Sequence, residues 1–227
     1  MLESFIPDKA ILLIESAGKR LALASNTIAR AMHIYHQFKR CIDTIDFEDG
    51  LVAASAIALS AKTNEDTLDL QNIVIVFWDM LNKDQVSLPK LNSEEFQELT
   101  DSLTKVQYLI CRALKFELNH LLAHQYVIPF LRNLHEIAEF QHKWDVFVNI
   151  VWKVVSTAYM SKKCLNYDAC EIAVASIYIT CQFCRIKTDV ITNWPEALSA
   201  TMKKEKLYAA IVEFLAVCGV ISVPNEI

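Results

Sequence analysis

The chain has 227 residues, of which 53% are hydrophobic and 22% charged, a balance that supports a sizeable buried core and excludes global disorder. Its 3 glycines and 5 prolines are too few for the closely spaced turns of an all-β sandwich or barrel. The net charge of −5, with 22 basic against 27 acidic residues, disfavours nucleic acid as the main ligand, because phosphate binding needs clustered lysine and arginine.

The first half of the chain predicts a series of helices, because its apolar residues recur at intervals of three and four. These helices are expected over residues 11–23, 28–38, 51–62, 69–81 and 94–114. Residues that can cap a helix N-terminus stand at the start of three of them: Ser25 to Thr27 for the second, Asp69 for the fourth and Ser93 for the fifth. The segment between the fourth and fifth helices contains Pro89 and is expected to be a loop.

The second half predicts the same organisation, with helices over residues 120–140, 144–162, 168–183, 188–199 and 203–217. The interruption near residues 116–119 is the expected domain boundary. We therefore expect an N-terminal domain over residues 1–117 and a C-terminal domain over residues 118–227. The boundary has no Gly/Ser-rich linker, so the two domains are expected to pack firmly together.

A faint internal repeat relates the two halves. Val52–Lys62 aligns without gaps with Ile172–Gln182, at an offset of 172 − 52 = 120, and small or apolar residues match at most positions. A helix that is small and apolar on every face must be surrounded by other helices, and alanine lets neighbouring backbones approach to about 8 Å. The repeat therefore predicts an all-α fold made of a tandem pair of five-helix bundles, each around a central Ala-rich helix.

No motif in the sequence assembles an active site or a metal centre. Cys181 and Cys184 form a CxxC on an apolar helix, but no second CxxC accompanies it. His120 and His124 have the spacing of two ligands on one helix face, but the glutamate of a HExxH metalloprotease is missing. There is also no Gly-rich phosphate loop and no Gly-x-Ser-x-Gly elbow. We expect a protein that is not an enzyme and needs no metal or cofactor.

The cysteine pattern and the apolar runs bear on location. Seven cysteines is an odd number, and several lie inside apolar runs, as expected of small buried residues in a reducing compartment. No apolar run approaches the roughly 18 residues of a membrane span. Acidic residues interrupt the start of the chain, unlike a secretory signal. A nuclear or cytoplasmic protein that does not enter a membrane is expected.

Three motifs carry a resemblance to the cyclin box fold. Ile34–Phe38 resembles the Tyr-His-Lys/Arg-Phe stretch of the second cyclin helix, and Ala53–Lys62 followed by Glu65 resembles the "Ala-Lys-x-x-Glu" signature. Gln107–Phe116 resembles the end of the fifth helix. The resemblance covers nearly the whole chain and is closest to cyclin Q and the transcription-type cyclins C, H, K, L and T. The segment from Asn193 to Pro195, with the helix after it, is similar to the tail of cyclin Q.

The resemblance implies a partner, the catalytic subunit of a cyclin-dependent kinase, in a heterodimer. Cyclins bind the mobile αC helix of the kinase and hold it inward, which lets the kinase form its Lys–Glu ion pair and frees its activation segment. The implied kinase-binding residues are Leu59, Lys62, Thr63, Glu65, Gln107, Cys111, Phe116 and Leu118. Lys62 would donate hydrogen bonds to kinase backbone carbonyls, and the apolar residues would help to form a cradle for αC.

The chain departs from the cyclin pattern at three places. Gln107 stands where many cyclins have a glutamate, which removes the charge-assisted part of that hydrogen bond. Thr63 is smaller and more polar than the usual residue at its position. The first helix lacks the Met-Arg-Ala-Ile-Leu patch with which cell-cycle cyclins bind Arg-x-Leu motifs, so no such docking site is expected.

Other interpretations of the sequence remain open. Taken alone, Lys62 is also consistent with a solvated lysine favoured by the dipole at a helix C-terminus, and Phe116 with a core residue. At the level of function, the alternatives are a cyclin-fold transcription factor of the IIB type, which the acidic charge balance disfavours, and an adaptor that binds a partner without activating a kinase. The neutral Gln107 keeps the adaptor in consideration.

Overall fold

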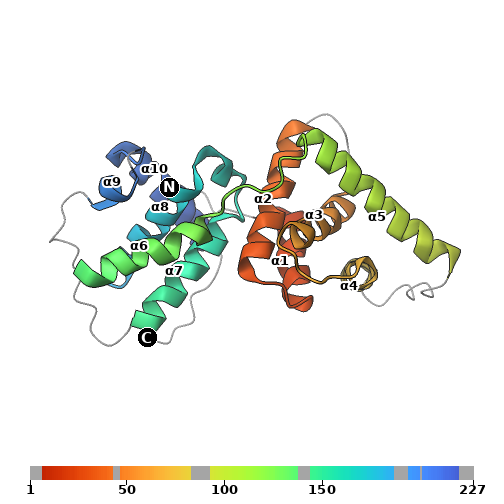
Figure 1. Cartoon of the computed structure of the whole chain (residues 1–227), viewed down its shortest axis with the longest axis horizontal. Coiled ribbons are helices and arrows are strands. Elements are labelled where there is room, and N and C mark those ends of the chain that lie inside the picture. Colours follow the sequence, from red (N-terminus) through yellow and green to blue (C-terminus); the bar gives the residue numbers. More distant parts are fainter. Residues whose placement is uncertain are drawn as a thin grey trace. The chain divides into compact units, whose positions relative to one another are not determined.

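A computed structural model of the chain describes residues 7–42, 47–82, 93–137, 144–186, 194–199 and 201–219. These residues form ten α-helices and one short 3₁₀ helix, with no strand among them, so the predicted all-α fold class is confirmed (Figure 1). None of the helices in these segments combines the length and apolar character needed to cross a membrane.

The described residues separate into two compact units. The first unit extends from Asp8 to His120 and the second begins at Leu121. The division therefore falls after residue 120, whereas the sequence predicts it after residue 117. Whether each unit folds as an independent domain stays a prediction.

The first unit is built around one central helix. Its helices are α1 (Lys9–Arg20), α2 (Ser25–Cys41), α3 (Asp49–Thr63), α4 (Leu70–Asn82) and α5 (Glu94–Ala113). Helix α3 contacts each of the other four, and every residue from Val52 to Ala61 is buried (Figure 1). The small side chains of this segment permit that close packing, as the repeat predicts.

The second unit repeats this plan. It contains α6 (Ala123–Ile137), α7 (Trp144–Ala158), the 3₁₀ helix η1 (Lys162–Asn166), α8 (Ala169–Phe183), α9 (Trp194–Leu198) and α10 (Lys204–Cys218). The central helix is α8, which contacts α6, α7, α9 and α10. The helix predicted over 188–199 is only the short α9 within the described residues, and 187–193 lie outside them.

The two central helices have the same length and align in register. Both ends differ by the predicted offset of 120, since Asp49 pairs with Ala169 and Thr63 with Phe183. The turns that follow also match. Glu65 and Arg185 both take the left-handed conformation, with φ of 59° and 53°. In each turn a later backbone N–H donates back to the helix, from Asp66 to Ala61 and from Ile186 to Cys181, both at 2.9 Å.

Two of the predicted helix caps are confirmed and one is wrong. Ser93 accepts a hydrogen bond from the Phe96 N–H at 3.3 Å, and Asp69 accepts one from the Gln71 N–H at 3.1 Å. Helix α2 instead begins directly at Ser25, with Ala24 at the cap position and no side-chain cap. Thr27, the last residue of the predicted capping stretch, is buried, and its hydroxyl is used in a tertiary contact with Asp66.

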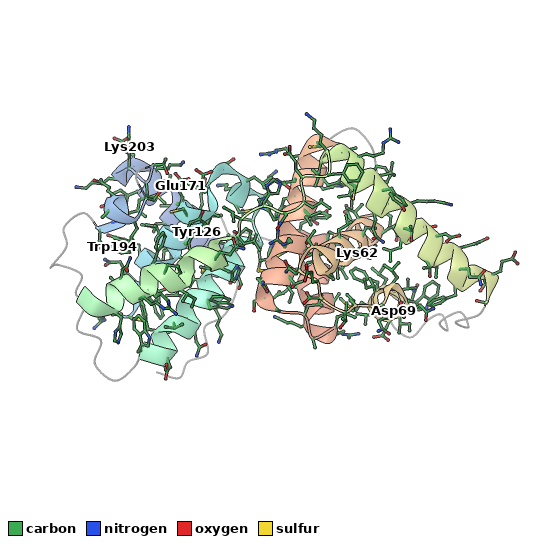
Figure 2. The ribbon with its side chains drawn as sticks, viewed as in Figure 1. Lys62, Asp69, Tyr126, Glu171, Trp194 and Lys203 are labelled. Atoms are coloured by element: carbon green, nitrogen blue, oxygen red, sulfur yellow. The ribbon has the colours of Figure 1, made fainter. Side chains whose placement is uncertain are left out.

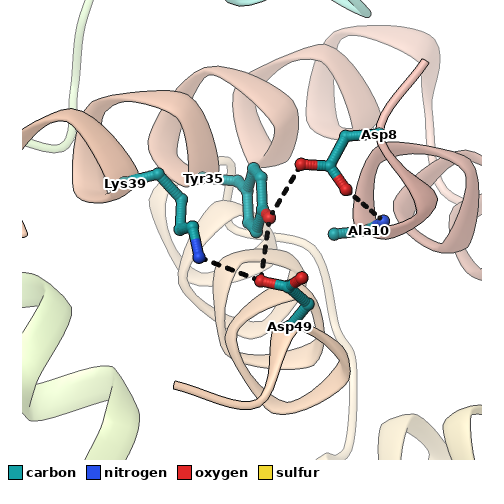
Figure 3. A network of polar contacts seen from close by, with 5 residues as sticks. All are labelled: Asp8, Ala10, Tyr35, Lys39 and Asp49. Atoms are coloured by element: carbon teal, nitrogen blue, oxygen red, sulfur yellow. Dashed lines mark hydrogen bonds and ion pairs between the residues drawn. The ribbon is translucent and has the colours of Figure 1, made fainter. Parts of the chain in front are cut away.

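A polar cluster fixes the start of two helices in the first unit (Figure 3). The buried hydroxyl of Tyr35 lies 3.3 Å from an oxygen of Asp8 and 3.2 Å from an oxygen of Asp49, which also accepts from Lys39. Asp8 caps α1 by accepting from the Ala10 N–H at 3.1 Å. Burial, reinforced by the two carboxylates, raises the pKa of Tyr35, so the phenol stays protonated and able to donate. Tyr35 thereby ties α1 and α3 to α2.

Candidate functional site

All of the predicted kinase-binding residues lie in the first unit: in the last turns of α3 and the turn after it, in the C-terminal half of α5, and in the segment after α5. We call this set the α3/α5 face; it consists of Leu59, Lys62, Thr63, Glu65, Gln107, Cys111, Phe116 and Leu118. The segment after α5, residues 115–120, is called the strap.

Lys62 and Gln107 form the polar centre of the α3/α5 face. Lys62 stands in the last turn of α3, where the helix dipole favours a cation, and its side chain is exposed (Figure 2). Its ammonium donates to the Gln107 Oε1 at 2.8 Å. Gln107 is only 4% exposed, and its Nε2 donates to the Leu103 carbonyl at 3.3 Å. The acceptor is a neutral amide, so it does not offset the positive charge of the lysine as a carboxylate would.

The apolar members of the face differ sharply in exposure. Leu59 and Cys111 are buried, whereas Leu118 is half-buried. Phe116 is 70% exposed, so the interpretation of this residue as core is excluded. Burial raises the pKa of the Cys111 thiol, against the opposing charge of Lys62, so the thiol is neutral and poorly reactive.

The turn that presents Phe116 has an unusual backbone. Lys115 and Phe116 take φ of 51° and 61°, in the left-handed region that glycine usually occupies. For a residue with a side chain this conformation costs roughly 1 kcal/mol or more. The Phe116 N–H donates to the Cys111 carbonyl at 2.7 Å, which closes the turn and offsets part of that cost. A large aromatic side chain is thus held in solvent by a strained turn.

Two other residues of the face, Thr63 and Glu65, lie at and just after the end of α3. Thr63 is half-buried, and its hydroxyl donates back to the Ser60 carbonyl at 2.8 Å, so it is directed toward its own helix. Glu65 is exposed in the left-handed turn described above. The structure thus brings Lys62, Gln107 and Cys111 together, with Thr63 and Glu65 on the adjoining turn and Phe116 on the strap.

The sequence interpretation missed one residue of this region, Arg30. Its side chain is buried in the N-terminal half of α2, and it donates to Asn64 beside the end of α3 and to two backbone carbonyls of the strap. The available signal was a single arginine among small and apolar residues, in the stretch Ile28–Met32. Buried charges of this kind are rare unless they are paired or hydrogen-bonded.

The histidine and cysteine pairs form no second site. Helix α6 begins at Ala123, so His120 is not on it, and the idea that His120 and His124 share one helix face is wrong. Burial, and then Cys184, raise the pKa of Cys181 to about 12, which makes it an unreactive thiol. Among the residues whose placement is described, no group of three or more His, Cys, Asp or Glu could hold a metal ion.

Comparison with known sequences gives distant relatives. No family model matches the chain. Human cyclin-T1 is 25% identical over 211 residues, which cover 90% of this chain and 28% of the relative. Cyclin-T1.2 of Caenorhabditis elegans is 24% identical over 226 residues, covering 93% of this chain and 38% of the relative. The chain thus spans well under half the length of these relatives.

Comparison with solved structures supports the fold. A chain in the crystal structure of the yeast RNA Pol II CTD kinase CTDK-1 complex superposes with a TM-score of 0.72. The match covers 91% of this chain and 63% of that chain, at 17% sequence identity. At that identity the match is informative about fold alone. Together with the cyclin-T relatives, it shows that this chain is a cyclin-fold protein that resembles the transcription-type cyclins.

Proposed function

We propose that this chain is the regulatory subunit of a cyclin-dependent kinase and that its α3/α5 face docks on the αC helix of the kinase. The cyclin-T relatives and the likeness to a chain of a CTD kinase complex support this proposal. A nuclear location is expected with it, as for other transcription-type cyclins. The protein would act by binding rather than by catalysis.

The observation that carries the proposal is that the predicted binding residues include both an exposed aromatic and a directed cation. Phe116 is 70% exposed on a turn that fixes its backbone, so it can enter an apolar pocket of a partner at little entropic cost. Lys62 is oriented by Gln107 and retains N–H donors for a partner's carbonyl oxygens. An apolar anchor together with an oriented donor suits the end of a helix in another protein.

Activation requires that the face bind one kinase conformation better than the other. A ligand shifts a two-state equilibrium only by its difference in affinity for the two states. Moving a kinase from about 1% to 99% active needs roughly 5.5 kcal/mol of preference for the state with αC inward. The chain would supply that preference by contacting αC only when the helix is held inward.

Binding can be tested by co-expressing the chain with each cyclin-dependent kinase of its source organism and measuring the affinity of any complex that purifies. Lys62→Glu should weaken the complex at least about tenfold, since it replaces a donor with a group that repels carbonyl oxygens. Lys153→Glu, an equal charge change at an exposed position of α7, should leave binding intact. Equal affinity of wild type and Lys62→Glu would contradict the assignment of this face.

An adaptor that binds a kinase without activating it is the second candidate. The neutral Gln107 supports it, because a glutamate at this position would strengthen the hydrogen bond that orients Lys62. A phosphorylation assay with the reconstituted pair separates the two functions: turnover well above that of the free kinase supports activation, and unchanged turnover supports the adaptor. A gel-shift titration with duplex DNA tests the disfavoured transcription-factor alternative, which saturable binding would favour.

A further inference from the structure

Arg30 is a buried cation that bonds to both sides of the α3/α5 face. Its guanidinium donates to the Asn64 Oδ1 at 3.0 Å, in the turn that ends α3. It also donates to the carbonyls of Leu118 and His120, at 3.3 and 2.9 Å, in the strap. We infer that Arg30 is a positioning residue that fixes the strap, and with it Phe116, relative to the end of α3. Its role in binding rests on the proposed function, but its role in positioning does not.

The α3 side of this arrangement is a continuous hydrogen-bond network. Asn64 donates from Nδ2 to the Thr27 hydroxyl at 2.8 Å, and that hydroxyl donates to Asp66 at 2.7 Å. The Ser60 hydroxyl donates to the Thr27 carbonyl. Because Asn64 and Asp66 lie on either side of Glu65, the network holds the left-handed turn that follows Lys62 against α2. Arg30 therefore donates to an Asn64 side chain that this network already holds in place.

The strap side consists of backbone groups that need a donor. The carbonyl oxygens of Leu118 and His120 both accept hydrogen bonds from the guanidinium of Arg30 in α2. The His120 ring adds a second attachment, since its Nε2 lies 3.1 Å from the Gln37 Nε2. The strap is thus fastened to α2 only two residues beyond Phe116. Without these bonds the left-handed turn would hold Phe116 from one side alone.

An arginine suits this position and a lysine does not. A guanidinium is a rigid, planar group with five N–H donors, so one side chain can bond to acceptors on two segments at once. A lysine ammonium is a point charge with three donors and cannot span the same acceptors. Arg30 is 4% exposed, and a charge buried to that degree is stable only when its hydrogen bonds are satisfied. The variant Arg30→Lys therefore keeps the charge and removes the bridging geometry.

Hydrogen exchange on the free protein tests the positioning role without any kinase. In Arg30→Lys the amides of Phe116, Glu117 and Leu118 should exchange about tenfold faster, because the strap opens locally, while α8 amides keep their rates. Arg132→Lys, at an exposed position of α6, should change neither set. Unchanged strap exchange would overturn the inference. So would an equal acceleration in all helices, which would indicate a purely global effect on stability.

A double-mutant cycle with a kinase that binds the chain tests the consequence for docking. Phe116→Ala should weaken binding at least about tenfold in the wild-type background but less than about threefold in Arg30→Lys, because a loose strap no longer presents Phe116. Additive effects would overturn the role of Arg30 in docking. If no kinase binds the wild-type chain, the proposed function fails, and the exchange experiment still decides whether Arg30 positions the strap.

Discussion

Helices α3 and α8 occupy the same place in the two units, yet they end on different chemistry. At the predicted offset of 120, Lys62 corresponds to Gln182 and Thr63 to Phe183. The first unit therefore ends its central helix on a cation oriented by Gln107, whereas the second ends on a neutral amide and an aromatic residue that is 57% exposed. Packing therefore constrains the buried length of both helices, whereas the exposed residues of their last turns can differ in charge and polarity.

The fifth helices of the two units resemble each other more closely than the ends of the central helices do. Both pack an apolar face on their central helix. Both also expose large apolar side chains, Tyr108 and Leu109 on α5 and Tyr208, Val212 and Leu215 on α10. The two units therefore share an inner design, and their fifth helices both keep apolar residues on the outer surface.

Buried charge distinguishes the units as well. The first unit buries the cation of Arg30, whereas the second buries the carboxylate of Glu171 completely. Glu171 accepts from the Asp168 N–H at 2.9 Å, which completes a capping box for α8, and from the Lys206 ammonium at 2.6 Å. Burial alone would raise the pKa of Glu171, but the hydrogen bonds from Lys206 and Asp168 outweigh it and the pKa is lowered.

The largest expected effect tests whether the two central helices are equivalent. Ala53 and Ala173 occupy matching, fully buried positions, so Ala53→Leu and Ala173→Leu should each lower the free energy of unfolding by about 3 kcal/mol through overpacking. Ala209→Leu, on the exposed side of α10, should change it little. Chemical denaturation measures all three. A large effect at one buried alanine and none at the other would show that the two central helices are not equivalent.

A smaller effect concerns the ion pair between Lys206 and the buried Glu171 in the second unit. Lys206→Met should lower the free energy of unfolding by about 2 kcal/mol at neutral pH, less than for a fully buried pair because Lys206 is 39% exposed. Lys163→Met, which removes the looser contact with Glu213 at 3.4 Å, is the control and should have a smaller effect.

The same pair predicts a dependence on pH. The pKa of Glu171 is lowered by folding, so its contribution to stability is present above the unfolded value of about 4.3 and is lost as the pH falls through the folded value. In Lys206→Met the buried carboxylate of Glu171 loses its cation, so its pKa should be raised. Protonation of Glu171 at low pH then removes the cost of burying an unpaired charge in the variant. The stability difference between wild type and variant should therefore shrink on acidification. A difference that grows below neutral pH would contradict this account of Glu171.

The core could be predicted from the sequence because small and apolar residues leave a central helix few alternatives. The position of Lys62 and Gln107 followed from the cyclin resemblance. The exposure of Phe116 could not be predicted, since an apolar residue near a helix end is equally consistent with core and surface, and only the left-handed turn decides it. Arg30 was missed because its strap acceptors are backbone carbonyls 88 and 90 residues away, which no side-chain pattern encodes.

Under the proposed function, the first unit docks on a kinase and the second unit does not. The most direct test compares two exposed phenylalanines, Phe116 in the strap and Phe183 at the end of α8, by measuring the affinity of the Phe116→Ala and Phe183→Ala chains for a co-purifying cyclin-dependent kinase. Docking through the first unit predicts at least about a tenfold loss of affinity for Phe116→Ala and no change for Phe183→Ala. A loss confined to Phe183→Ala, or equal in both, would contradict it.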